Sequence, residues 1–121
     1  MNGKKIFVTG ANGMLGSNLI KTLKCGNIVG CGQELDITKP SVVFEKLDVI
    51  KPNIIIHTAA LTNVEECEVE QNKTYLVNSI GTQNLVNYCI DKDILFIYIS
   101  STGIYGINKK DEYTEFDKVE P

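Results

Sequence analysis

The chain has 121 residues, 43% of them hydrophobic, and a formal net charge of −3, which predicts one globular domain with an ordinary core. All twelve cationic residues are lysines, so the chain has neither the basic balance of a nucleic-acid-binding protein nor an arginine clamp for phosphate. Its apolar runs are all far shorter than the ~20 residues that span a membrane.

Short apolar runs alternate with segments of helical periodicity along the chain. A helix is expected to start at Thr38-Lys39-Pro40, with Thr38 as its cap and Pro40 in its first turn, and to be ended by Lys51-Pro52-Asn53. The last long helix should place Leu76, Ile80, Leu85 and Cys89 on one apolar stripe. In chain order we expect the strand Ile6–Val8, the helix Met14–Lys24, the strand Ile28–Cys31, the helix that starts at Thr38-Lys39-Pro40, the strand Ile54–Ala60, a helical stretch from about Asn63 with its longer part over Lys73–Ile90, and the strand Ile94–Ile99.

This alternation, with strands that are apolar on both faces, is typical of a parallel sheet covered by helices on both sides. We therefore predict an α/β fold, a Rossmann-like doubly wound parallel sheet with right-handed crossovers and the strand order 3-2-1-4, truncated after about four strands. Such sheets bind ligands outside the carboxyl ends of their strands. Gly10–Gly16, Thr58–Ala60 and Ser100–Thr102 all follow such ends.

The segment Thr9–Gly16 carries glycines at positions 10, 13 and 16, after a strand and at the start of a helix. In this setting Gly10 permits the tight turn, Gly13 lets the backbone approach a pyrophosphate, and Gly16 lets the helix pack closely on the strand. The helix N-terminus adds its positive dipole end. The sequence therefore predicts a dinucleotide-binding turn.

An acidic residue about 20 residues after this turn would bind the ribose 2′-hydroxyl. The strand Ile28–Cys31 is followed by Gly32-Gln33-Glu34, so Glu34 is a late candidate, and a solvated glutamate is the alternative. Asp36 either lies beside the adenine or fixes the loop before Thr38. The choice between NAD and NADP stays open.

Taken together, these segments resemble the extended short-chain dehydrogenase/reductase superfamily, and within it the dTDP-4-dehydrorhamnose reductases and related sugar-nucleotide oxidoreductases. The resemblance runs in family order over essentially the whole chain. The matching segments are residues 9–16, 35–38 (Leu-Asp-Ile-Thr), 51–60 (Lys-Pro-Asn-Ile-Ile-Ile-His-Thr-Ala-Ala), 77–85, 99–106 (Ile-Ser-Ser-Thr-Gly-Ile-Tyr-Gly) and 113–115.

The resemblance implies NAD(P)H as cofactor and a nucleotide-linked sugar as substrate. It implies that Ser101, four residues before Tyr105, bonds the substrate carbonyl oxygen, with Thr102 as the neighbouring candidate and a strand-end serine bonded to backbone as the structural alternative. Asn78 is expected to bridge helix and sheet. The residues expected at the cofactor are Gly10, Asn12, Gly13, Met14, Leu15, Gly16, Asp36, Ile37, Ala59, Ala60 and Ser100.

The family's general acid is a tyrosine with a lysine four residues later. We interpret both matches here, Tyr88 with Lys92 and Tyr105 with Lys109, as chance occurrences, because the first precedes Ser101 and the second contains Gly106 and Asn108. The true pair is expected beyond Pro121. We thus expect residues 1–121 to be a partial NAD(P)-binding Rossmann domain, without the catalytic tyrosine and lysine helix or the C-terminal substrate-binding part, and inactive alone.

Two other functions stay open. One is part of a sugar-nucleotide epimerase or dehydratase, although dehydratases favour an Asp-Glu pair where Thr102-Gly103 stands here. The other is a non-catalytic nucleotide-binding regulatory protein of the same fold. The apolar edge Ile94–Ile99 is expected to need a cover, and a homodimer is one candidate.

The cysteines and the single histidine are interpreted as structural residues without a catalytic or metal-binding role. Cys25, Cys31, Cys67 and Cys89 form no CxxC pair, which is typical of reduced thiols in a cytoplasmic protein. With one histidine, no metal site is expected. That histidine, His57, is interpreted as a packed side chain bonded to nearby backbone.

Overall fold

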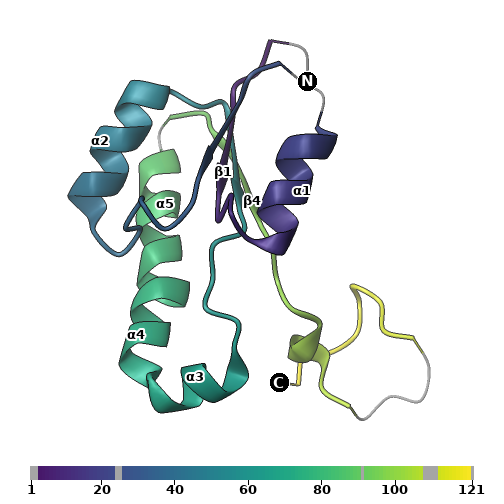
Figure 1. Ribbon diagram of the computed structural model, residues 1–121. Coiled ribbons are helices and arrows are strands. Elements are labelled where there is room, and N and C mark those ends of the chain that lie inside the picture. The colour runs from purple at the N-terminus through teal and green to yellow at the C-terminus, as the bar shows by residue number, and fades with distance from the viewer. Residues whose placement is uncertain (1–2, 24–25, 91, 108–111, 121) are drawn as a thin grey trace.

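The computed structural model describes residues 3–23, 26–90, 92–107 and 112–120. Within them, four parallel strands form one sheet, with helices on both faces (Figure 1). The strands are β1 (Ile6–Thr9), β2 (Ile28–Cys31), β3 (Ile54–His57) and β4 (Leu95–Tyr98). The helices are α1 (Met14–Thr22), α2 (Pro40–Ile50), α3 (Val64–Val69), α4 (Gln71–Tyr75), the π-helical turn η1 (Leu76–Gly81), α5 (Thr82–Cys89) and the 3-10 turn η2 (Thr102–Tyr105). The α/β class is confirmed; Lys24, the expected end of the first helix, lies outside the described residues.

The strand order is β2-β1-β3-β4, so the expected order 3-2-1-4 is wrong. The third strand pairs with β1 rather than with β2, because the connection after β2 crosses back over β1 and adds β3 on the other side of β1. All four residues of β3 are buried, whereas three of the four in β2 are half-buried or exposed. The most apolar strand therefore takes the central place, and the strand containing Gly30 forms an edge.

The reversal places α1 and α2 on opposite faces of the sheet. On one face, Ile6, Val8, Ile54 and Ile56 pack with residues of α1. On the other, alternate residues of the same strands pack with α2 and α5; this larger cluster contains Phe7, Ile55, Val43, Leu47, Ile50, Leu85 and Tyr88. Both faces of β1 and β3 are thus covered, as their continuous apolar sequences require.

The strands end at one level. Thr9, the last residue of β1, is paired with Cys31 and with His57, and His57 is paired with Tyr98. The segments that follow these ends are consequently brought side by side. The expected strand Ile54–Ala60 stops at His57, so residues 58–60 belong to the loop at this edge.

Two local expectations are wrong. Lys39, not Thr38, is the N-cap of α2, and it forms no side-chain cap, because the Thr38 hydroxyl donates to Asp36 Oδ1 at 2.6 Å. The expected stripe from Leu76 to Cys89 is broken by η1, which changes the helical phase. Leu76 is 48% exposed, while Leu85 is fully buried.

The free edge of β4 is apolar, as expected. Leu95 and Tyr98 keep 57% and 55% of their surface exposed. Among the helices of the described residues, none combines the length and the apolar character needed to cross a bilayer.

Candidate functional site

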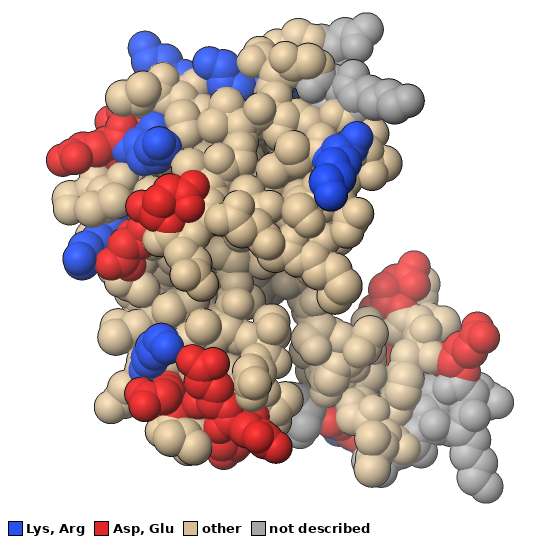
Figure 2. All heavy atoms as spheres, viewed as in Figure 1, with Lys and Arg blue, Asp and Glu red and all other residues tan. Residues whose placement is uncertain are grey.

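A cleft of about 920 Å³ opens at the carboxyl ends of β1, β2 and β3. Figure 2 shows this side of the molecule, which is hollowed between the main body and the acid-rich segment α3–α4. Seven of the expected cofactor residues line the cleft: Gly10, Asn12, Gly13, Asp36, Ile37, Ala59 and Ala60. The other expected residues, Met14, Leu15, Gly16, Ser100 and Ser101, are not part of its lining.

The turn after β1 touches the loop after β3 at Gly10. Gly10 has a φ of +67°, and a Cβ there would lie 2.7 Å from the Ala59 nitrogen and 2.8 Å from the Thr58 carbonyl carbon. Only a residue without a side chain fits both constraints. Gly16 is buried and packs on the carbonyl of Gly10, which fixes the start of α1 against the end of β1.

The N-terminus of α1 faces this turn without a side-chain cap. Gly13 is the N-cap and has extended backbone angles. A Cβ at Gly13 would meet just one atom among the described residues, the Gly10 oxygen at 3.2 Å. Met14 is 86% exposed. The first N–H groups of α1 are therefore positioned as anion donors, which is the arrangement a pyrophosphate needs.

Two carboxylates lie in the loop after β2, and both are bound by their own loop. Glu34 Oε1 accepts from the Gly32 N–H at 2.8 Å, and this bond lowers the pKa of Glu34. Asp36 Oδ1 accepts from the hydroxyl and the N–H of Thr38, which lowers the pKa of Asp36. Asp36 therefore both lines the cleft and fixes the loop, and Glu34 is a lining residue as well.

Ile37 forms the neighbouring apolar wall. A Cβ on Gly81 would lie 2.7 Å from Ile37 Cδ1, so the π-helical turn contacts Ile37 directly. The Ile37 carbonyl accepts from Asn84 Nδ2 at 2.9 Å. The position of this wall is thus set by residues of η1 and α5 that the sequence analysis did not single out.

The loop after β3 is held at several points. Thr58 Oγ1 donates to the Thr9 carbonyl at 2.7 Å, and the Ala59 N–H donates to Thr9 Oγ1 at 3.3 Å. The Asn78 side chain accepts from the Leu61 N–H and donates to the Leu61 carbonyl, at 2.8 and 2.9 Å. Asn78 therefore joins the helix to the loop that follows β3.

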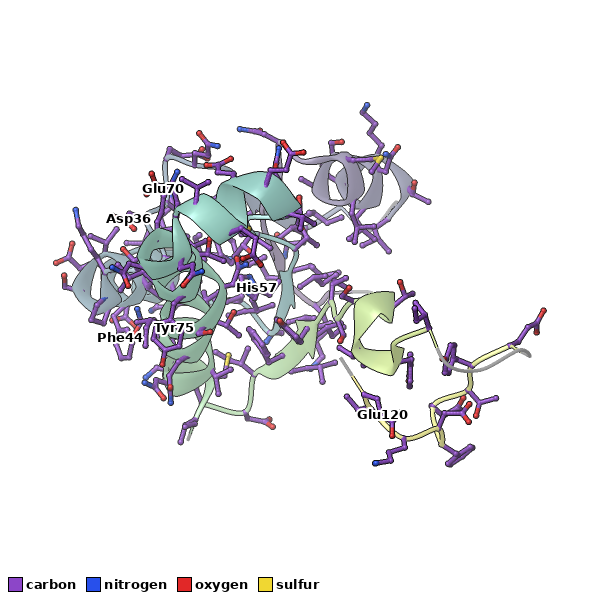
Figure 3. All side chains as sticks on the ribbon, turned by 90° about the horizontal axis from the view of Figure 1, so that it is seen from below. Asp36, Phe44, His57, Glu70, Tyr75 and Glu120 are labelled. Carbon is purple, nitrogen blue, oxygen red and sulfur yellow. The ribbon has the colours of Figure 1, made fainter. Side chains whose placement is uncertain are left out.

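His57 is the last residue of β3, where this loop begins, and lies near the centre of the view in Figure 3. It is 2% exposed, and its neighbours are hydroxyls rather than the expected backbone groups. Nδ1 lies 2.6 Å from Thr9 Oγ1 and Nε2 lies 2.9 Å from Thr82 Oγ1. Burial lowers the pKa of His57 to about 4, so the imidazole is neutral at physiological pH.

Ser101 lies at the start of η2, outside the cleft lining. It is exposed, and its Oγ accepts from the Gly103 N–H at 3.1 Å. The Tyr88–Lys92 pair does not face the cleft: the Tyr88 hydroxyl donates to Asp48 at 2.9 Å, and burial raises the pKa of Tyr88 to about 12. Tyr105 stacks on Tyr113, and Lys109 lies outside the described residues.

Comparison with known proteins identifies the family. The family described as "RmlD substrate binding domain" matches residues 4–121. This chain belongs to that family. A dTDP-4-dehydrorhamnose reductase from Aggregatibacter actinomycetemcomitans is 34% identical over 97% of the chain and 41% of the relative. The resemblance stated from the sequence is thereby confirmed.

Solved structures of proteins named dTDP-4-dehydrorhamnose reductase have the same fold as this chain. A dTDP-4-dehydrorhamnose reductase from Clostridium acetobutylicum has a TM-score of 0.89 and 36% identity, with 97% of this chain and 43% of that chain covered. One from Bacillus anthracis, in complex with NADP, has a TM-score of 0.91 and 33% identity, with 100% and 44% covered. The chain thus spans less than half the length of these members of the RmlD family.

The sequence analysis assigned no role to three threonines whose hydroxyls hold the loop after β3 and His57, namely Thr9, Thr58 and Thr82. The signal was present, because Thr9 and Thr58 stand at the ends of paired strands, beside Gly10 and His57. In the described part of the chain, no group of three acidic, cysteine or histidine side chains could hold a metal ion.

We predict that Gly10→Ala destabilises this family member strongly. The positive φ costs about 1–2 kcal/mol for a residue with a Cβ, and the clash with the loop after β3 adds about 1–3 kcal/mol. Gly26→Ala is the matched control, because no atom of the described residues lies within 4 Å of its Cβ position. Urea unfolding measures both; equal stabilities of the two variants would contradict the close approach at Gly10.

We also predict that His57 makes stability fall in acid. Neither state carries a proton on His57 above about pH 6.5. As the pH falls from about 6.5 to about 4, the unfolded chain binds a proton that the folded chain excludes. This difference in proton uptake lowers the free energy of unfolding by up to about 3 kcal/mol. Unfolding measured across this range should show a smaller loss in His57→Gln than in the parent; identical pH profiles would contradict it.

Proposed function

We propose that this chain is the NAD(P)H-binding part of a sugar-nucleotide oxidoreductase that reduces a dTDP-4-keto-6-deoxy sugar. The observation that carries the proposal is the cleft whose floor is the glycine turn and the uncapped start of α1. The relatives support it, since three proteins named dTDP-4-dehydrorhamnose reductase match nearly the whole chain, and the solved structure of the one from Bacillus anthracis holds NADP.

The residues fit a dinucleotide in size and in donor set. The open space beside Gly13 and the first N–H groups of α1 would hold the pyrophosphate, while Gly16 fixes the helix beneath it. Ile37, Ala59 and Ala60 would provide apolar walls, and Glu34 or Asp36 would accept from ribose hydroxyls. Asn12, Met14, Leu15 and Ser100 would complete the contacts at the rim.

When bound, NAD(P)H supplies the hydride that reduces the C4 carbonyl. The part assigned to this chain is to polarise that carbonyl through Ser101. The Oγ of Ser101 accepts one hydrogen bond from the Gly103 N–H, which leaves the hydroxyl proton available for the carbonyl oxygen. A donor aimed at the oxygen where negative charge develops lowers the barrier. The proton donor would be the tyrosine expected beyond Pro121.

The sequence Thr102-Gly103 favours this reduction over the dehydratase alternative. A homodimer belongs to the same proposal and is supported by the exposed apolar edge of β4. The proposed location is the cytoplasm, which the free thiols of Cys31, Cys67 and Cys89 support.

Titration with NADH and NADPH tests the cofactor proposal. We expect quenching of the protein's tyrosine fluorescence, or a calorimetric signal, with at least one of the two. Gly13→Val should abolish it by filling the space for the pyrophosphate, whereas Gly26→Ala should leave it unchanged. Failure of the unaltered chain to bind either dinucleotide at millimolar concentration would sink the proposal.

Substitution of Ser101 tests the reaction. In the full-length enzyme, Ser101→Ala should lower kcat by about 100- to 1,000-fold, the effect of removing one donor to a developing oxyanion. Thr102→Val should retain most activity. The reverse pattern would transfer the role to Thr102, and full activity of both variants would contradict polarisation by this segment.

A further inference from the structure

The buried imidazole of His57 joins the two groups that anchor the loop 58–61. One anchor is Thr9, which binds Thr58 and Ala59; the other is Asn78, which binds Leu61. His57 lies within hydrogen-bond distance of Thr9 on one side and of Thr82 on the other. Residues 58–61 all line the cleft.

The hydrogen-bond directions follow from counting protons. Thr82 Oγ1 donates its single proton to the Asn78 carbonyl at 2.7 Å, so toward His57 it accepts. The proton of the neutral ring therefore resides on Nε2, and Nδ1 is an acceptor. Thr9 Oγ1 can then donate to Nδ1 and still accept the Ala59 N–H.

The opposite tautomer does not satisfy the same groups. With the proton on Nδ1, Thr9 Oγ1 would accept from both the ring and the Ala59 N–H. The single hydroxyl proton of Thr82 could then be donated to Nε2 or to the Asn78 carbonyl, but not to both. Either the buried Nε2 atom or the Asn78 carbonyl would lose the Thr82 hydroxyl as its donor, which is costly inside a protein. The geometry thus selects one proton arrangement.

We propose that His57, fixed as the Nε2–H tautomer, is a positioning residue that holds the loop 58–61 in its binding shape by linking Thr9 to Thr82 and Asn78. Its path runs from the Ala59 N–H through Thr9, His57 and Thr82 to the Asn78 carbonyl. It joins the ends of β1 and β3 to the helix formed by η1 and α5. The effect on binding rests on the proposed dinucleotide function, but the tautomer and the loop geometry do not.

The surroundings of His57 suit this static role. The rings of Phe96 and Tyr98 on β4 lie 5.9 and 6.0 Å from its centre, and burial is the cause of its lowered pKa. A neutral ring in these surroundings keeps one tautomer, because both nitrogens have committed partners.

Nitrogen-15 NMR of the imidazole tests the tautomer without any ligand. His57 is the only histidine of the chain, and in a longer protein its signals are those lost in His57→Gln. We expect a protonated Nε2 and an unprotonated Nδ1 at neutral pH. A protonated Nδ1, or an averaged mixture of both forms, would overturn the proposal.

Amide exchange tests the positioning. His57→Phe should speed exchange at Ala59 by about tenfold, the effect of one lost hydrogen bond. His57→Asn should restore protection, since its Oδ1 can replace Nδ1 as the acceptor for Thr9. Thr82→Val should also loosen the loop, whereas Thr74→Val is the matched control, because Thr74 Oγ1 is a buried hydroxyl with no partner in the described structure.

Cofactor affinity separates this inference from the proposed function. We expect NADH or NADPH to bind His57→Phe about tenfold more weakly than the parent and to bind His57→Asn at an intermediate level. If the parent binds neither, the proposed function fails while the tautomer and exchange results still decide the role of His57. Unchanged Ala59 exchange in both His57→Phe and Thr82→Val would refute that role.

Discussion

Backbone meets backbone at Gly10, and this close approach organises the whole end of the sheet that carries the cleft. The turn after β1 and the loop after β3 lie so near each other that no Cβ fits between them. On the other side, Gly16 packs on the Gly10 carbonyl and brings the start of α1 to the same place. Main chain from β1, α1 and the post-β3 loop is therefore fixed as one unit. A site built in this way has its shape before any ligand arrives, which reduces the ordering cost of binding.

The reversal of chain direction after β2 creates the space above that unit. Because α1 and α2 cover opposite faces of the sheet, their connections diverge where β1 and β3 end, and a crevice opens at this switch point. The level ends of the strands place the loop after β2 on one side of the crevice and the loop after β3 on the other. The strand order that buries β3 in the centre of the sheet is therefore also the cause of the cleft.

The sequence predicted where the helices and strands lie along the chain better than it predicted which of them pack together in space. Ile28–Cys31 was predicted with its observed bounds. Thr9–Gly16 was predicted to form a turn between a strand and a helix from the spacing of its glycines, and the structure has that turn between β1 and α1. The order of the strands was wrong, since alternation and right-handed crossovers fix the hand of each connection but not its direction along the sheet. The π-helical turn was missed because one extra residue per turn changes the phase without an unusual residue to mark it. For His57, burial was foreseen, but its partners come from β1 and α5, 48 and 25 residues away, and no local pattern reports such a contact.

The overall negative charge does not oppose binding of an anionic dinucleotide, because the relevant fields are local. The dipole of α1 acts mainly within its first turn, and exposed charges beyond about 10 Å are screened at ordinary salt. Figure 2 shows acidic side chains gathered over α3 and α4, yet Glu66, which reaches the cleft, is paired with Lys73 at 3.0 Å. Glu34 and Asp36 are likewise engaged by N–H groups of their own loop. The carboxylates nearest the cleft are thus engaged where they lie, by Lys73 or by N–H groups of their own loop, and the start of α1 has no side-chain cap that would compete with a phosphate for its N–H groups. The proposed site therefore needs no arginine to hold a pyrophosphate, since its donors would belong to the backbone.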